Sequence, residues 1–286
     1  MPLVSVAELL QPALAAGYAV PSFCVWNAET VLTVLGVAAD LRSPVILMNG
    51  PGEFPLLAPA DLAAVVRAVA GRFPVPAALH LDHGDCLEQV DACLAAGYTS
   101  VMLDYSTRPY AENASALRAV AARAHPRGIT VEGELGHVGR VDTVTAEGGT
   151  HSTLTDPAEA AAFVADTGVD ALAVSIGNAH GQYTRLPRLD FERLAAIRAA
   201  VSVPLVLHGG TGTPPEDLRR AIALGIAKVN VATELVTALR GSLLEQWQAG
   251  RNLWVPLAQA EAIRAVALVV EKWVRGTGAA GRGVRC

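Results

Sequence analysis

Eight short apolar runs recur along the chain, and helix-like segments separate them. Each run is nearly continuous in Val, Ile, Leu and Ala, which is typical of parallel strands that are buried on both faces. The absence of a composition break or a Pro/Ser-rich linker between the units predicts an α/β fold, a single (β/α)8 TIM barrel over residues 1–286. The expected strands are 19–25, 44–49, 76–82, 99–104, 129–135, 170–176, 203–208 and 227–232.

Helix-start signals fall between these strands. A capping side chain stands three residues before an acid at Asp85, at Asp156 and at Thr213. We expect one extra helix at each end of the chain, over 5–16 and about 257–275. A doubly wound open sheet is the alternative, but the GxGxxG fingerprint is missing after the first strand.

The long Gly- and Thr-containing insertion at 136–153 predicts a mobile active-site loop rather than packed structure.

Composition excludes several classes of partner. The formal net charge of −5 comes from 22 basic and 27 acidic residues that are mixed along the chain, which argues against nucleic acid and against an anionic membrane surface. The apolar runs are too short for a membrane span, and the first residues show no secretory signal. The four cysteines form no CxxC pair or disulfide framework, so we expect a cytoplasmic protein.

Histidines and carboxylates gather at the carboxyl ends of the expected strands, where barrel enzymes build their active sites. Three histidines at matching rim positions offer Zn²⁺ a set of ligands with one position left open, which predicts a catalytic metal site. Among the carboxylates, Asp82 is expected to be functional, Glu134 and Asp104 to bind the metal or support its ligands, and Glu132 is as compatible with a structural role. The strand-end residues are Asp82, His83, Asp104, Glu132, Glu134, His180 and His208.

The other histidines are not expected to bind the metal. We expect His80, one step back in the third strand, to be a hydrogen-bonded structural group, and His125 and His137 to lie at the surface or in a loop.

A phosphate site is expected after the seventh and eighth strands. The loops that follow these strands commonly bind phosphate through backbone N–H groups and a helix N-terminus. The segments 209-GGTG-212 and 230-NVATE-234 stand there, and Gly181 follows His180. A tight turn followed by an ordinary helix cap is the alternative for GGTG alone.

Several motifs in a fixed order resemble one enzyme family. The chain resembles the class II, zinc-dependent ketose-bisphosphate aldolases, and most closely their tagatose-bisphosphate aldolase branch. The resemblance runs nearly end to end, and its main motifs are 79-LHLDH-83, 132-EGELG-136, 178-NAHG-181, 204-PLVLHGG-210 and 228-KVNVATEL-235.

The resemblance implies reversible aldol cleavage of tagatose or fructose 1,6-bisphosphate to dihydroxyacetone phosphate and an aldehyde such as glyceraldehyde 3-phosphate. Zn²⁺ would bind His83, His180 and His208, with Glu134 as an accessory metal carboxylate, and a monovalent cation (Na⁺ or K⁺) would assist. Asp82 would exchange the proton of the C4 hydroxyl. Family members are often dimers or tetramers, so a homo-oligomer is expected. The residues expected to hold the phosphate are Gly181, Gly209, Gly210, Thr211, Asn230, Val231, Ala232 and Thr233.

The chain departs from the family pattern at several positions. Cys24 replaces the usual substrate-contacting Asn, Tyr105 replaces a glycine, and Arg140 replaces a loop glycine. Asp142 stands where the family has the loop glutamate that moves the C3 proton, with Glu147 as the alternative. Arg282 lies in a tail that resembles one bringing a basic residue to the distal phosphate.

Two other functions stay open on the sequence. A Schiff-base aldolase needs a desolvated lysine, and the chain has only Lys228, near the start of the eighth strand and away from the rim, and Lys272. A barrel that binds metal or sugar phosphate without catalysis is the other alternative, and the altered loop and Cys24 favour it.

Overall fold

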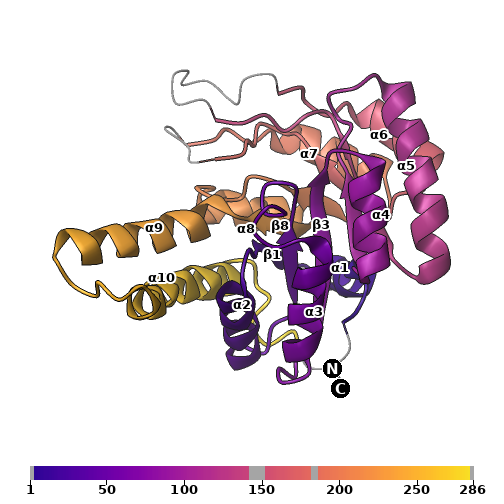
Figure 1. Ribbon diagram of the computed structural model, residues 1–286. Coiled ribbons are helices and arrows are strands. Elements are labelled where there is room, and N and C mark those ends of the chain that lie inside the picture. The colour runs from indigo at the N-terminus through magenta and orange to yellow at the C-terminus, as the bar shows by residue number, and fades with distance from the viewer. Residues whose placement is uncertain (1–2, 142–151, 182–185, 284–286) are drawn as a thin grey trace.

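The strands form a closed parallel barrel in the order β1 to β8, and helices surround it (Figure 1). The computed structural model describes residues 3–141, 152–181 and 186–283. The strands are β1 (Val20–Cys24), β2 (Val45–Asn49), β3 (Ala77–Gly84), β4 (Ser100–Leu103), β5 (Thr130–Leu135), β6 (Ala171–Val174), β7 (Leu205–Leu207) and β8 (Ile226–Val231). This α/β TIM barrel confirms the predicted fold class.

The helices alternate with the strands, and two of them stand outside the alternation. The first, α1, precedes β1, and α10 follows the helix of the eighth unit. The helices are α1 (Val6–Ala16), α2 (Ala28–Asp40), α3 (Pro59–Ala70), α4 (Leu87–Ala96), α5 (Tyr110–Ala124), the short 3₁₀ helix η1 (His125–Arg127), α6 (Pro157–Thr167), α7 (Phe191–Ala200), α8 (Pro215–Ala223), α9 (Thr233–Gln248) and α10 (Val255–Gly276).

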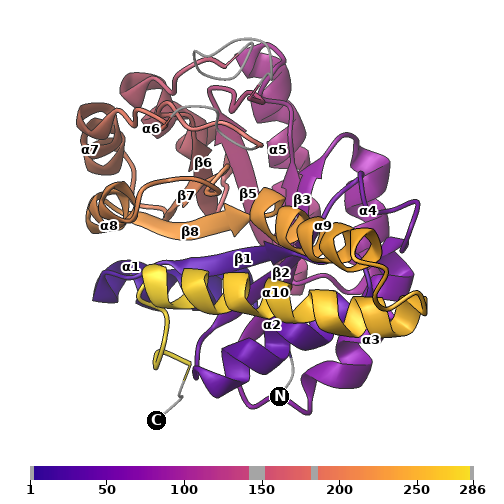
Figure 2. The ribbon, with the colours of Figure 1, turned by 90° about the vertical axis from the view of Figure 1, so that its left-hand side faces the viewer.

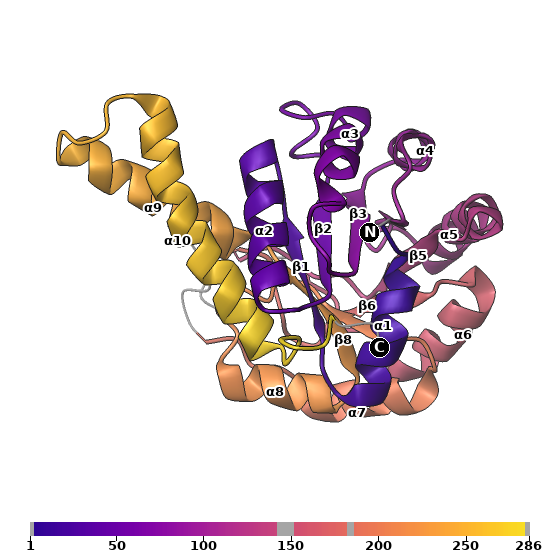
Figure 3. The ribbon, with the colours of Figure 1, turned by 90° about the horizontal axis from the view of Figure 1, so that it is seen from below.

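Two apolar layers hold the barrel together. The larger packs the outward-facing strand residues against the surrounding helices, and the smaller lies inside the barrel at its amino end. In the inner layer Leu10 and Ala13 of α1 pack with Ile46, Ala171 and other apolar residues of the strands. Figure 3 shows α1 crossing this end of the barrel. The amino end is thereby closed, and the carboxyl ends of the strands are left to form a site.

The helix caps match the sequence signals only in part. Ser5 and Glu8 form a capping box at the start of α1, and the expected cap Asp156 accepts through its side chain from the Ala158 amide at the start of α6. The other two expected caps are wrong, because α4 begins after Cys86 and α8 after Pro214, and neither start has a side-chain cap.

The last two helices form a hairpin that projects beside the barrel. Figures 2 and 3 show α10 running antiparallel to α9 and alongside α2. None of the helices in the described part of the chain combines the length and the apolar character needed to cross a bilayer.

Candidate active site

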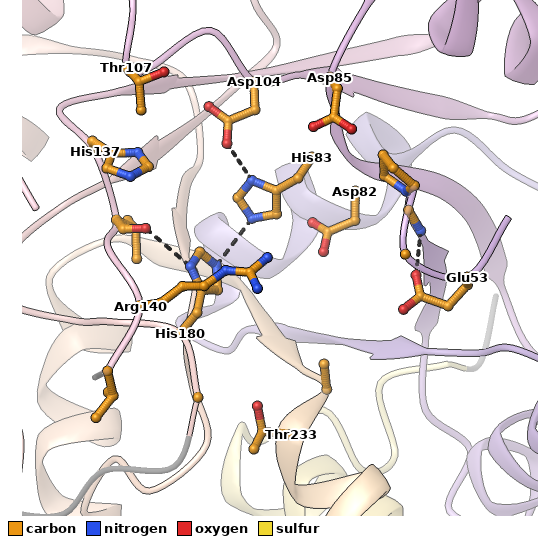
Figure 4. Close-up of a pocket in the computed structure, with 17 residues that line it drawn as sticks. Glu53, Asp82, His83, Asp85, Asp104, Thr107, His137, Arg140, His180 and Thr233 are labelled. Carbon is orange, nitrogen blue, oxygen red and sulfur yellow. Dashed lines mark hydrogen bonds and ion pairs between the residues drawn. The ribbon is translucent and has the colours of Figure 1, made fainter. Parts of the chain in front are cut away.

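The pairing of β3 is irregular at its carboxyl end, and two consecutive side chains there point into the same pocket. Side chains normally alternate between the two faces of a strand. The pairing of β3 with β4 shifts register between Leu81 and Gly84, and His83 has a left-handed backbone with φ +48°. Bulges beside active sites re-aim side chains in this way, and left-handed non-glycine residues concentrate at functional sites. As a result Asp82 and His83 both line the pocket in Figure 4.

Three imidazoles converge beside this bulge. His180 follows β6 and His208 follows β7. His83 Nε2 lies 3.1 Å from His180 Nε2 and 2.8 Å from His208 Nδ1. Nitrogen ligands about 2.0–2.1 Å from a tetrahedral Zn²⁺ would be roughly 3.3 Å apart. The spacing and the donor chemistry of these nitrogens therefore fit a single metal ion.

The outward-facing nitrogen of each histidine contacts an oxygen. His83 Nδ1 lies 2.7 Å from Asp104 Oδ2, and His208 Nε2 lies 2.9 Å from Glu132 Oε1. His180 Nδ1 donates to the Val138 carbonyl over 3.1 Å. Such contacts fix the tautomer and the orientation of metal-binding histidines. They direct the lone pairs of the inner nitrogens toward one point.

Buried carboxylates give this point a negative field. Burial alone would lower the pKa of His83, but the charge of Asp82 and the hydrogen bond to Asp104 raise it to about 10. Burial and the charge of His83 lower the pKa of His180 to about 3. The carboxylates around His83 therefore favour positive charge at this point, and the same negative field would favour a metal cation.

Glu134 adds a buried carboxylate to the metal-binding group. Its Oε2 accepts no hydrogen bond from the described residues, although His208 Nδ1 is 3.4 Å away. Burial raises the pKa of Glu134. Glu134 also groups with His83 and Asp104 as a second set of ligand atoms within 4.8 Å of one another. A buried oxygen without a donor is a suitable metal ligand.

Below the histidines a buried ion pair fills the barrel interior. Lys228 Nζ lies 2.8 and 3.0 Å from the two Glu132 oxygens and 3.3 Å from His80 Nε2. His80 Nδ1 contacts Ser100, in agreement with the structural role expected for His80. Glu132 contacts His208 and neutralises the charge of Lys228, so it supports the histidines from the barrel interior.

The phosphate-site residues do not all face the pocket. Gly181, Ala232 and Thr233 line it, and α9 begins at Thr233. The Gly210 amide donates to the Asn230 carbonyl, so it has no free N–H for phosphate. Gly209 is needed for packing, because it has φ +62° and an added Cβ would lie 2.0 Å from the Ala179 carbonyl oxygen.

The remaining members of that set turn to other partners. Val231 is buried in the outer apolar layer. Thr211 Oγ1 accepts from the Glu234 amide at 3.3 Å. The Asn230 side chain donates to Asp82 Oδ1 at 2.8 Å and so positions that carboxylate. These three residues are not among those that line the pocket.

Arg282 is not near the site. Its guanidinium stacks over the Tyr18 ring at 5.4 Å, and Gly281 and Gly283 donate backbone hydrogen bonds to Leu41 and Arg42, just before β2. This is the amino end of the barrel, opposite to the pocket. Within one chain, Arg282 is not among the residues that line the pocket. The expected loop residues Asp142 and Glu147 lie outside the described residues.

Some pocket residues were not identified by sequence reasoning. His137, expected to be an ordinary loop or surface residue, lines the pocket, with Nδ1 2.8 Å from Ser106 Oγ and 3.6 Å from Glu134 Oε1. Glu53 and Asp85 line it as well. Their positions directly after β2 and β3 were the available signal, because loops at that end of the strands form the site.

The chain is similar to known proteins over nearly its whole length. Residues 4–282 match the family described as Fructose-bisphosphate aldolase class-II. The YdjI aldolase of Escherichia coli K12 is 34% identical, with 99% of this chain and 100% of that chain covered and a TM-score of 0.87. A putative fructose-1,6-biphosphate aldolase of Coccidioides immitis is 33% identical, with 96% of each chain covered and a TM-score of 0.82.

A more distant structure shares the fold. The fructose-bisphosphate aldolase of Campylobacter jejuni is 22% identical, with 97% of this chain and 96% of that chain covered and a TM-score of 0.83. Since the family match spans nearly the whole chain and two solved structures exceed 30% identity, the chain belongs to the class II fructose-bisphosphate aldolase family, and it is an aldolase.

Proposed function

We propose that the protein catalyses the zinc-dependent, reversible aldol cleavage of a phosphorylated ketose to dihydroxyacetone phosphate and an aldehyde. The observation that carries this proposal is the convergence of the inner nitrogens of His83, His180 and His208 beside the Asp82 carboxylate. We assign these histidines as the Zn²⁺ ligands and Glu134 as an accessory carboxylate. Zn²⁺ held there would supply Lewis-acid stabilisation of the negative charge that develops on the ketose as the C3–C4 bond breaks.

Asp82 is assigned as the group that accepts the C4 hydroxyl proton. Asn230 holds one carboxylate oxygen, and burial raises the pKa of Asp82 against the opposing charge of His83. A raised pKa brings a carboxylate closer to the range in which it can both take and return a proton. Asp104 is assigned as the residue that orients His83 rather than as a ligand, because its Oδ2 contacts the outer nitrogen of that ring.

The phosphate of the substrate is assigned to the side of Gly181, Ala232 and Thr233. All three line the pocket, and Ala232 and Thr233 stand at the start of α9, a helix of 16 residues. The first N–H groups of a helix and its dipole favour an anion there.

A Schiff-base mechanism fits this site poorly. Lys228 is fully buried and ion-paired with Glu132 inside the barrel, beneath the histidines. A lysine nucleophile must be neutral and must reach the substrate carbonyl. Its ion pair and its place below the pocket floor argue against both requirements.

The function is tested by an assay for dihydroxyacetone phosphate. The protein, stripped of metal and then reloaded with Zn²⁺, is incubated with fructose and tagatose 1-phosphates and 1,6-bisphosphates, and release is followed with a coupled reductase. We expect release from at least one of these ketoses by the reloaded protein and none by the stripped protein. Zinc binding without cleavage of any of them would favour a non-catalytic barrel.

We further propose that the protein is a homo-oligomer assembled through the α9–α10 hairpin. Large apolar side chains are exposed along this hairpin, including Trp247, Leu253, Trp254 and Leu257, which are 43–77% exposed. Several large exposed apolar side chains within one short hairpin favour an interface, and two copies of the hairpin can cover each other symmetrically.

The oligomer is tested by changing the apolar tip of the hairpin. Light scattering of the purified protein is expected to give a mass above one 29.7 kDa chain. The double variant Leu253→Ser/Trp254→Ser is expected to shift the mass toward the monomer, whereas Leu186→Ser, an exposed leucine before α7, should not. A monomeric parent protein would refute the proposal.

A further inference from the structure

The pocket extends beyond the metal-binding histidines. Its volume is about 950 Å³, and it continues past the histidines to the loop after β2 and the turn after β3. Gly50, Pro51, Gly52 and Glu53 line it from the first segment, and Asp85 from the second. If the phosphate end of the ketose lies by Gly181 and Thr233, this opposite region must take the half that leaves as the aldehyde.

The two sides of the pocket carry opposite charge. In Figure 4 Glu53 and Asp85 lie on one side of Asp82, and Arg140 lies on the other, next to His180. Arg140 is the only Lys or Arg among the described residues that line the pocket. It belongs to the segment that pairs with His180, where the Val141 amide donates to the His180 carbonyl at 2.7 Å. The aldehyde region is therefore acidic, and the region beside His180 is basic.

Glu53 is held in place rather than free to swing away. Its Oε2 accepts from the Gly50 amide at 2.8 Å. The loop is pressed against β3, because a Cβ added at Gly50 would lie 2.4 Å from the Asp82 carbonyl oxygen. Cys24, which is buried at the end of β1, also hydrogen-bonds Glu53, and burial together with the Glu53 charge raises the pKa of the thiol. The carboxylate is thus a fixed feature of the wall.

A carboxylate in the pocket wall selects against anions and for hydroxyl groups, and Glu53 is held there by its hydrogen bonds. A like charge brought into a partly desolvated wall is repelled, and such repulsion is a common source of specificity. Sugar hydroxyls, in contrast, donate charge-assisted hydrogen bonds to carboxylates. With Arg282 at the other end of the barrel, the described lining of the aldehyde region offers a second phosphate no cation.

We infer that the aldehyde half of the substrate is an uncharged polyhydroxy chain, so that the enzyme acts on ketose 1-phosphates in preference to ketose 1,6-bisphosphates. Glu53 and Asp85 are the specificity-determining residues, and Arg140 faces the phosphate-bearing half. This inference rests on the proposed function and narrows its substrate class.

The test measures condensation of dihydroxyacetone phosphate with D-glyceraldehyde and with D-glyceraldehyde 3-phosphate by the zinc-loaded protein. We expect kcat/KM to favour the uncharged aldehyde by at least about tenfold. Glu53→Gln and Glu53→Gln/Asp85→Asn should move this ratio progressively toward the phosphorylated aldehyde, by about tenfold or more in the double variant. Asp61→Asn removes the same charge from exposed Asp61, in the first turn of α3 outside the pocket, and should leave the ratio unchanged.

A second measurement separates this inference from the proposed function. Exchange of the C3 hydrogen of dihydroxyacetone phosphate with deuterium oxide needs no aldehyde, so it reports the phosphate half of the site alone. A parent protein that exchanges but prefers the phosphorylated aldehyde overturns the inference and leaves the function standing. An unchanged ratio in both variants, with exchange intact, overturns it as well. A parent protein with neither exchange nor condensation overturns the proposed function, and this inference with it.

Discussion

Asp82→Ala is expected to keep its zinc and to lose cleavage activity, with kcat lowered by about 10²- to 10⁴-fold, the usual contribution of a general acid or base. The carboxylate lies beside His83 in the pocket, yet its oxygen is held by the Asn230 amide rather than by an imidazole. Its removal should therefore take away the proton acceptor and leave the three histidine contacts intact. Steady-state cleavage and metal content measured on the same preparation check both parts.

Asp82→Asn provides the conservative control for this result. The amide keeps the volume of the side chain and can still contact Asn230 through its oxygen, but it cannot accept the hydroxyl proton. We expect it to be nearly as inactive as Asp82→Ala. Full activity in either variant would show that another group moves the proton, and loss of zinc from both would make Asp82 a support of the metal site instead.

Replacing a histidine of the triad should abolish zinc binding and activity together. His180→Ala removes one of three imidazoles whose inner nitrogens lie within 4.8 Å of one another. The site is arranged for three imidazoles around one ion, so the loss of one of these ligands should lower its affinity for zinc. We expect less than about one tenth of the parental zinc content after dialysis and a fall in kcat of at least about 10³-fold, since the Lewis acid is lost.

Two further variants should affect zinc binding to smaller degrees or not at all. Asp104→Asn should weaken zinc affinity by only about 10- to 100-fold, the usual effect of losing an orienting contact to a metal-binding histidine. His125→Ala, which removes an exposed histidine paired with Asp170 far from the pocket, should change neither zinc content nor activity. Full zinc content in His180→Ala, measured by elemental mass spectrometry, would contradict the assigned ligand set.

Much of the fold could be read from the sequence because the strands of a closed barrel have a strong and repeated signature. The eight apolar runs match the strands to within about two residues at most ends. The rim histidines were found for the same reason, because they stand at or after the carboxyl ends of these strands, which meet at one rim of the barrel. The starts of the helices followed the sequence signals less closely. Asp85 and Thr213 are residue types that often cap helices, but they do not cap α4 and α8.

The remaining differences concern choices that only three-dimensional contacts decide. The Gly210 amide could have faced a phosphate, but the Asn230 carbonyl takes it. Arg282 could have turned to either end of the barrel, and its segment pairs with the chain before β2. His137 resembled an ordinary loop residue because its partners, Ser106 and Glu134, lie on other segments. Neither local propensity nor periodicity carries information about such partners.

The left-handed backbone of His83 restricts how this position can evolve. Among residues other than glycine, Asn, Asp and His accept this conformation most readily. The backbone at this position therefore limits which amino acids can replace His83, independently of their ability to bind a metal. Cysteine and glutamate are good metal ligands elsewhere, but here they would carry a conformational penalty. A change of metal preference in a descendant of this protein should therefore begin at His180 or His208, neither of which has a positive φ, while His83 stays as it is.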